Sequence, residues 1–259
     1  MADKTKRIVL KFGSGILARA DGSALETGQF TRFAAEVSAL VKAGHECIIV
    51  SSGAVAAGLK ALRLGERPRD LPTIQACAAV GQSKLMELYA KAFGAHKINV
   101  AQLLLTHDDL DSRLRYQNAK NTLRRLLKAG NVVPIINEND SVAVEELKFG
   151  DNDRLSAEVA ILAGADMLIL LTSVDGLLDK KGRLVPVVND VRKVESLART
   201  EKGRFSVGGM ASKLQAVRIA AEAGVRAAIA NGRTPGQINA LVKGDAAGTL
   251  FPVARVSKM

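Results

Sequence analysis

The sequence predicts an α/β fold in which an open, mostly parallel β-sheet is sandwiched between helices. Short apolar runs rich in β-branched residues alternate with longer segments whose apolar residues recur at helical spacing. The apolar runs are continuous rather than alternating, which is typical of strands covered on both faces. The 259 residues contain no linker rich in Pro or Ser, so we expect a single domain. A division near residue 170 would separate two lobes of one sheet, residues 1–170 and 171–259.

The first half of the chain supplies four predicted strands and the helices between them. Each strand is a short apolar run, and glycines follow or end two of the helices. The strands are expected at 7–13, 46–53, 98–105 and 131–136, and the helices at 27–44, 71–93 and 112–129. The long helix 71–93 contains Gly81, and a glycine inside a helical pattern is a position at which the helix can break.

The second half continues the alternation with two more strands. Helices are expected at 153–163 and 209–223, and strands at 166–172 and 225–231. Between the two halves, residues 142–149 alternate between apolar and polar side chains, which predicts a small exposed hairpin.

Composition narrows the class of protein. The net charge of +11 favours anionic partners, and on charge alone these include both phosphorylated small molecules and nucleic acid. An aromatic content of 3% without Trp argues against stacking platforms for bases, so we expect no nucleic-acid partner. Cys47 and Cys77 lie in apolar segments without metal-ligand spacing, which indicates buried thiols in a reducing compartment. No apolar run has transmembrane length and no signal-peptide core follows the amino terminus, so we expect a cytoplasmic protein without a membrane partner.

Glycines and small polar residues follow most of the predicted strands. In an open α/β sheet, ligands bind beyond the carboxyl ends of the strands. The segments at these ends are KFGSG (11–15), SSGAVAAG (51–58), NENDS (137–141), TSVDGL (172–177) and NGRTPG (231–236). The sequence therefore predicts a site assembled from several loops at one edge of the sheet.

Two lysines and a cluster of carboxylates indicate chemistry on phosphate. Lys11 ends a strand before two glycines, and Lys213 follows the glycine pair of VGGMASK (207–213). Glycines let backbone N–H groups approach an anion, and lysine is unfavourable near a helix start unless an anion is bound there. The acidic segment 137–153 follows another strand, and carboxylates can hold cations, a metal or an amine. The combination suits phosphoryl transfer, although the Walker, serine-hydrolase and EF-hand patterns are all missing.

Taken together, the motifs resemble those of the glutamate 5-kinase branch of the amino acid kinase family. They are KFGSG, SSGAVAAG, AAVGQS, VPIINENDSV, FGDNDRLSA and GGMASKLQA, and they follow in order along essentially the whole chain. The resemblance implies an enzyme that phosphorylates the side-chain carboxylate of L-glutamate with ATP and Mg²⁺, at the start of proline biosynthesis. It also implies feedback inhibition by proline and a homo-oligomer, either a dimer or a tetramer.

The same resemblance assigns residues to roles by matching motif. Lys11 and Lys213 resemble the two phosphate-binding lysines, and Asp153 resembles the carboxylate that orients both. The positions that resemble glutamate-binding residues are Ser52, Asp140 and Asn152, with Asn137 and Asp151 close by. The positions that resemble nucleotide contacts are Lys11, Gly13, Thr172, Ser173, Val207, Gly208, Gly209, Met210, Ala211, Ser212 and Lys213. No residue is assigned to a protein-held metal.

Two features depart from the family pattern. Ser173 and Leu178 stand where the family usually has an acid and an aromatic residue, so the contacts with the nucleotide are expected to differ there. Many members also carry a C-terminal domain resembling RNA-modifying enzymes, which we expect to be absent because the chain ends at Met259.

The alternatives are a kinase of acetylglutamate, aspartate or a nucleoside monophosphate, or a non-catalytic regulator that binds nucleotide or nucleic acid. The NEND and GDND motifs argue against the other kinases, and intact Lys11, Asp153 and Lys213 argue against a regulator.

Overall fold

A computed structural model describes residues 5–19, 24–66, 68–143, 152–200 and 209–253. Its strands are β1 (Arg7–Phe12), β2 (Glu46–Ser51), β3 (Asn99–Leu105), β4 (Val132–Glu138), β5 (Met167–Thr172), β6 (Arg226–Asn231) and β7 (Thr249–Phe251). Its α-helices are α1 (Ser14–Leu17), α2 (Thr27–Lys42), α3 (Ala54–Ala61), α4 (Leu71–Gly94), α5 (His107–Asp111), α6 (Arg113–Leu127), α8 (Asn152–Ala163), α9 (Met210–Glu222) and α10 (Gln237–Lys243). Two 3-10 helices, η1 (Val191–Lys193) and η2 (Glu195–Thr200), precede α9.

The strands of the described residues form one seven-stranded sheet in the order β3-β4-β2-β1-β5-β6-β7. All neighbouring pairs are parallel except β6 and β7, which are antiparallel. In the parallel part, Phe12 lies beside both Ser51 of β2 and Leu171 of β5, so the strands end at a common edge. The predicted open, mostly parallel sheet between helices is confirmed.

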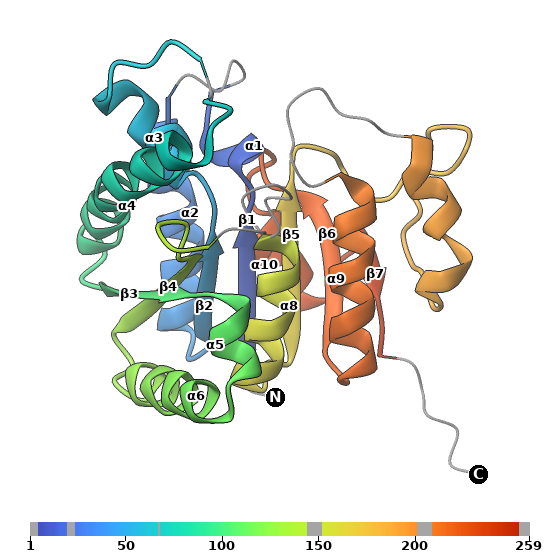
Figure 1. Ribbon diagram of the computed structural model, residues 1–259. Coiled ribbons are helices and arrows are strands. Elements are labelled where there is room, and N and C mark those ends of the chain that lie inside the picture. The colour runs from blue at the N-terminus through green and yellow to red at the C-terminus, as the bar shows by residue number, and fades with distance from the viewer. Residues whose placement is uncertain (1–4, 20–23, 67, 144–151, 201–208, 254–259) are drawn as a thin grey trace.

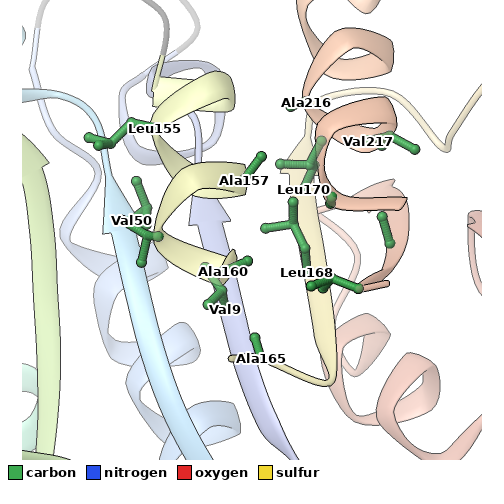
Figure 2. Close-up of a cluster of buried hydrophobic side chains, with 14 of the residues drawn as sticks. Val9, Val50, Leu155, Ala157, Ala160, Ala165, Leu168, Leu170, Ala216 and Val217 are labelled. Carbon is green, nitrogen blue, oxygen red and sulfur yellow. The ribbon is translucent and has the colours of Figure 1, made fainter. Parts of the chain in front are cut away.

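Each face of the sheet has its own apolar core, because alternate residues of a strand point to opposite faces. Val9, Val50 and Leu168 point to the face covered by α6, α8 and α9, where Figure 2 shows them beside Leu155 and Val217. On the other face, side chains from the same strands pack against α2, α4 and α10. The helices lie in layers on both sides of the sheet (Figure 1). This double covering explains why the strand sequences are continuously apolar.

The long helix α4 runs through Gly81 without interruption. The glycine serves packing, since a Cβ at Gly81 would lie 1.8 Å from the carbonyl oxygen of Ala54 in α3. A Cβ at Gly58 would likewise lie 1.9 Å from the carbonyl oxygen of Cys77 in α4. The two helices therefore cross with their backbones in contact, and the break left open at Gly81 does not occur.

Other details differ from the sequence-based expectations or lie outside the described residues. The antiparallel strand β7 was not predicted, since three residues give too short a pattern to identify. Helix α8 begins at Asn152, one residue before the expected start. Residues 144–151, most of the expected hairpin, lie outside the described residues. In the described part of the chain, no helix is both long and apolar enough to cross a bilayer.

Candidate active site

The loops at the carboxyl edge of the sheet are joined to one another through their backbones. The N–H of Ser52, after β2, donates to the carbonyl oxygen of Phe12 at 3.1 Å. The N–H of Asn139, after β4, donates to Leu105 at 2.9 Å, and that of Gly232, after β6, donates to Thr172 at 2.7 Å. These bonds continue the parallel ladder beyond the strands and hold the loops side by side.

A buried charge cluster lies at this edge. Asp153, at the start of α8, receives Lys11 Nζ on Oδ1 at 2.5 Å and Lys213 Nζ on Oδ2 at 3.1 Å. The hydroxyl of Ser212 also donates to Oδ2 at 2.8 Å. The lysines are 6% exposed and the aspartate 1%. Three elements far apart in sequence, β1, α8 and α9, therefore bring one carboxylate and two ammonium groups together.

The two lysines keep Asp153 ionised. Burial alone would raise the pKa of this carboxyl group. The charges of Lys11 and Lys213, with hydrogen bonds from Lys11 and Ser212, outweigh burial and lower the pKa to about 2. At neutral pH Asp153 is therefore ionised and serves as a common partner for both lysines.

A second, neutral cluster lies beside the first and begins at Asn152. Its Nδ2 donates to the carbonyl oxygen of Ser51 at 2.7 Å, and to Ser52 Oγ and Asn137 Oδ1, both at 2.9 Å. Asn137 Nδ2 in turn donates to Gln82 Oε1 at 2.9 Å. We call Ser52, Gln82, Asn137 and Asn152 the amide cluster. It links the ends of β2 and β4 to α4 and α8.

Two polar atoms of the amide cluster have capacity for another bond. Asn152 Oδ1 and Gln82 Nε2 are buried and have no hydrogen-bond partner within the described structure. One is an acceptor and the other a donor. Such groups are costly to leave unpaired, and in native proteins they commonly mark a site for water or ligand.

Three residues at the site, Gln82, Ser51 and Tyr89, were not predicted from the sequence to belong to it. Gln82 lies inside α4, within the AAVGQS motif, and only its contact with Asn137 places it in the cluster. Ser51 Oγ and Tyr89 OH lie 2.8 Å apart beneath the end of β2. Burial raises the pKa of Tyr89, so its hydroxyl stays protonated and supports Ser51. The signal for all three is tertiary, because only contacts between α4, β2 and β4 place these side chains beside the site.

The residues expected to contact nucleotide lie at the ends of β1 and β5 and the start of α9. Gly13 precedes α1, and a Cβ there would lie 3.4 Å from Lys11 Nζ, so the glycine leaves this lysine its space. Thr172 ends β5, and a Cβ on Gly15 would lie 3.9 Å from Ser173 Oγ. Helix α9 begins after its N-cap, Gly209. In its first turn, Met210 and Lys213 are buried and Ala211 is exposed.

Asp140 lies half-buried just after β4. Asp151, Val207 and Gly208 lie outside the described residues. Ser52 does not cap α3, because the N-cap of this helix is Gly53, with φ +105°, and the helix has no side-chain cap bond. The serine hydroxyl instead accepts from Asn152.

Among the described residues, no group of three or more His, Cys, Asp or Glu side chains could hold a metal ion. Asp153 is engaged with both lysines.

Comparisons with known proteins agree with this geometry. The model of the amino acid kinase family matches residues 6–231. The glutamate 5-kinase of Geobacter sp. (strain M21) is 47% identical over 255 residues, covering 96% of this chain and 68% of the relative. The glutamate 5-kinase of Citrifermentans bemidjiense is 46% identical over the same length, with the same two coverages.

Solved structures support the fold. The UMP kinase of Bacillus anthracis superposes with a TM-score of 0.61 at 16% sequence identity, covering 95% of this chain and 96% of that chain. At this identity, the likeness concerns the arrangement of helices and strands alone. The chain therefore belongs to the amino acid kinase family, and it shares its sequence pattern with the glutamate 5-kinases of that family.

Proposed function

We propose that this chain transfers the γ-phosphoryl group of ATP to the γ-carboxylate of L-glutamate and forms L-glutamyl 5-phosphate, the first step of proline biosynthesis. The observation that carries the proposal is the pair of buried lysines on Asp153 beside the amide cluster. The first cluster suits phosphate, and the second suits a zwitterionic amino acid. Relatives named glutamate 5-kinase, at 46–47% identity over nearly the whole chain, support the same reaction.

The nucleophile in this reaction is the substrate's own γ-carboxylate. Its reference pKa is about 4.3, so it is ionised at neutral pH and needs no general base. An oxygen of the carboxylate forms a bond to the γ-phosphorus while the β–γ bridging P–O bond breaks, and the electron pair leaves with ADP. The barrier that the protein must lower is the repulsion between the carboxylate and the triphosphate.

Lys11 and Lys213 are the residues placed to offset that repulsion. Both are buried, and both are held by one carboxylate at opposite oxygens. In a site that excludes water, such fixed cations stabilise charge that moves toward the bridging oxygen in the transition state. Asp153 acts through the lysines and is therefore a positioning residue. Mg²⁺ bound to the ATP phosphates would supply further positive charge.

The amide cluster, with Asp140, is proposed to bind the amino acid. The substrate ammonium group needs acceptors, which Asp140 and Asn152 Oδ1 provide, while the α-carboxylate needs donors such as Ser52 Oγ. Asn137 holds Asn152 in place through the bond at 2.9 Å. Asp151 is included in this proposal on its motif alone. An ammonium requirement would exclude amino-blocked analogues such as N-acetylglutamate.

The nucleotide is proposed to lie over the other part of the site. Lys11, Gly13, Thr172, Ser173 and the segment 207–213 are the proposed contacts. In this arrangement, residues up to about 170 bind the amino acid and residues 171–259 supply most of the nucleotide site, within a single domain. The side chains of β1 and α8 are proposed to contribute to both the amino-acid site and the nucleotide site.

The proposal also includes inhibition by proline, the oligomeric state, the location and the partners of the enzyme. Proline presents an α-carboxylate and a cationic nitrogen like those of glutamate, so we expect it to compete for the amide cluster. The loop 65–72 and the AAVGQS motif would shape the shared pocket. We also propose a homo-oligomeric, cytoplasmic enzyme that uses Mg²⁺ and has no nucleic-acid or membrane partner.

A coupled ADP-release assay tests the function. With MgATP, L-glutamate should support turnover, whereas L-aspartate, N-acetylglutamate and UMP should not. Hydroxylamine trapping of the acyl phosphate, as the hydroxamate, would identify the product. Turnover with aspartate, N-acetylglutamate or UMP in place of glutamate would identify another kinase of the family. Nucleotide binding without turnover on any acceptor would indicate a regulator.

A further inference from the structure

Arg233, in the loop after β6, reaches across to the segment that follows β1. Its Nη2 donates to the carbonyl oxygen of Gly15 at 2.8 Å and to that of Ala18 at 3.2 Å. Its Nη1 lies 3.4 Å from Glu26 Oε2, just before α2. Gly15 and Ala18 are 218 and 215 residues away in sequence. One guanidinium group therefore ties the C-terminal half of the chain to α1 and to the residue before α2.

The loop that carries Arg233 is itself held in place. The backbone N–H of Arg233 donates to Asn231 Oδ1 at 2.9 Å, and Asn231 Nδ2 donates to Asp175 Oδ1 at 2.8 Å. From the other side, Arg32 of α2 donates to the carbonyl oxygens of Gly232 and, at 3.4 Å, of Thr234. The position of Arg233 is thus fixed by hydrogen bonds from both halves of the chain.

The two segments that Arg233 joins are also in direct contact. A Cβ on Gly232 would lie 2.6 Å from Ile16 Cδ1, so the loop after β6 packs against α1 without any space for a side chain. The segment held in this way, residues 13–18, begins two residues after Lys11. It contains Gly13, whose missing side chain leaves Lys11 Nζ its space at 3.4 Å.

We propose that Arg233 is a positioning residue for the nucleotide: it fixes residues 13–18 so that Gly13 and Lys11 meet the triphosphate in one geometry. The inference rests on the proposed function for its nucleotide. The carbonyl oxygens of Gly15 and Ala18 belong to the segment that must stay in place when a polyanion is bound next to it. The amide cluster lies on β2, β4, α4 and α8, and none of its hydrogen bonds described above involves Arg233.

The chemistry of arginine matters for this task. A guanidinium group is planar and has several fixed donors, so it can bond two carbonyl oxygens and a carboxylate at the same time. A lysine at this position keeps the charge, but its three donors lie on one nitrogen and lack the planar, forked geometry. We therefore expect Arg233→Lys to retain part of the effect and Arg233→Met, which keeps much of the apolar stem, to lose it.

The experiment compares wild type, Arg233→Lys, Arg233→Met and the control Arg115→Met. Arg115 also pairs with an aspartate, Asp109, at 2.9 Å, but it lies on α6 away from the loops described here. Isothermal titration measures binding of ADP and of a non-hydrolysable ATP analogue with Mg²⁺, and steady-state kinetics measure KM for ATP and for glutamate. Thermal unfolding of each variant reports whether it is folded.

Arg233→Met should bind the ATP analogue about tenfold more weakly, since it loses hydrogen bonds from a charged donor. Arg233→Lys should be intermediate, the control should match wild type, and the KM for glutamate should stay unchanged. Wild-type affinity in Arg233→Met would overturn the inference, as would an equal loss in the control or a parallel rise in the KM for glutamate. If Arg233→Met does not fold, Arg233→Lys decides by the same criteria.

The two proposals fail separately in this design. Wild-type protein that binds the ATP analogue but does not phosphorylate glutamate would reject the proposed function, while the binding series would still test Arg233. Wild-type protein that binds no nucleotide would overturn both.

Discussion

Asn152 and Asp153 are consecutive residues at the start of α8, yet they belong to two clusters of opposite physical character. Asp153 holds two lysines in a buried charge cluster. Within the described residues, Asn152 donates to neutral partners, namely a backbone carbonyl, a hydroxyl and an amide. Because adjacent side chains of a helix point in different directions, one turn of α8 serves both clusters.

The difference between the clusters also concerns where their members come from. The charge cluster joins β1 and α8, which lie before residue 170, to α9, which lies after it. The amide cluster is built from α4, β4, α8 and the segment after β2, all of which lie before residue 170. A reaction between a phosphorylated and a zwitterionic substrate needs this division, because each substrate is then recognised by its own chemistry.

Burial of the charge cluster costs free energy unless its charges are well paired. Removing charges from water is costly, and the cost is recovered only with good pairing. Here two buried ammonium groups contact the same carboxylate, so the loss of one aspartate would affect both. The amide cluster contains no charged side chain. We therefore expect large effects on the chemical step from the first cluster and smaller effects, on amino-acid binding, from the second.

The largest effect should come from the lysines. Lys11→Ala and Lys213→Ala should each lower kcat about a hundredfold, since each removes a charge-assisted contact worth about 3 kcal/mol in the transition state. The KM for glutamate should change much less. Steady-state kinetics measure both, with Lys91→Ala on α4 as a control that should match wild type. Near-normal turnover in either lysine variant would show that the charge cluster takes no part in the chemical step.

Asp153→Asn should lower kcat by a smaller factor, because the lysines remain but lose their common partner. Its effect should be strongly non-additive with Lys213→Ala, since the aspartate acts through the lysines. Kinetics of the two single variants and the double variant decide this, after thermal unfolding has established that each is folded. Fully additive losses, or an effect limited to the KM for glutamate, would place Asp153 with the amide cluster.

The sequence was sufficient to predict much of the charge cluster. Lys11 and Lys213 stand beside glycines at a strand end and a helix start, and the aspartate is part of a specific motif. Such signals are local, because they combine unusual residue types within a few positions. In the structure, β1, α8 and α9 bring Lys11, Asp153 and Lys213 together at the carboxyl edge of the parallel sheet.

The amide cluster was predicted less completely, for a physical reason. Gln82 stands in a helix of ordinary composition, and a glutamine there usually faces solvent. Only the close crossing of α3 and α4 at Gly58 and Gly81, together with the end of β4, buries it against Asn137. The bridge that Arg233 makes to residues 15 and 18 was likewise invisible, since no local pattern connects residues that far apart.

A fall in pH should destabilise the charge cluster, which contains a carboxylate, and should not act in this way on the amide cluster, whose side chains are neutral. The pKa of Asp153 is lowered from 3.8 to about 2, so its carboxylate contributes stability that is present above pH 4 and is lost as pH falls toward 2. The free energy of unfolding of wild type relative to Asp153→Asn should therefore fall by about 2 kcal/mol across this range. Urea unfolding between pH 5 and the lowest pH at which the protein stays folded measures it. A difference independent of pH would show that Asp153 is not held ionised by the lysines.

The smallest effect should come from Gln82, and it should appear in a different parameter. Gln82→Leu removes the acceptor of Asn137 Nδ2 and the unpartnered donor Nε2, so Asn137 and Asn152 lose part of their support. One neutral hydrogen bond contributes about 1 kcal/mol, which corresponds to a rise of about fivefold in the KM for glutamate. Gln82→Glu keeps the acceptor and should restore part of the loss, while the KM for ATP stays constant in both variants. A change confined to the KM for ATP would show that the two clusters are not separated by substrate.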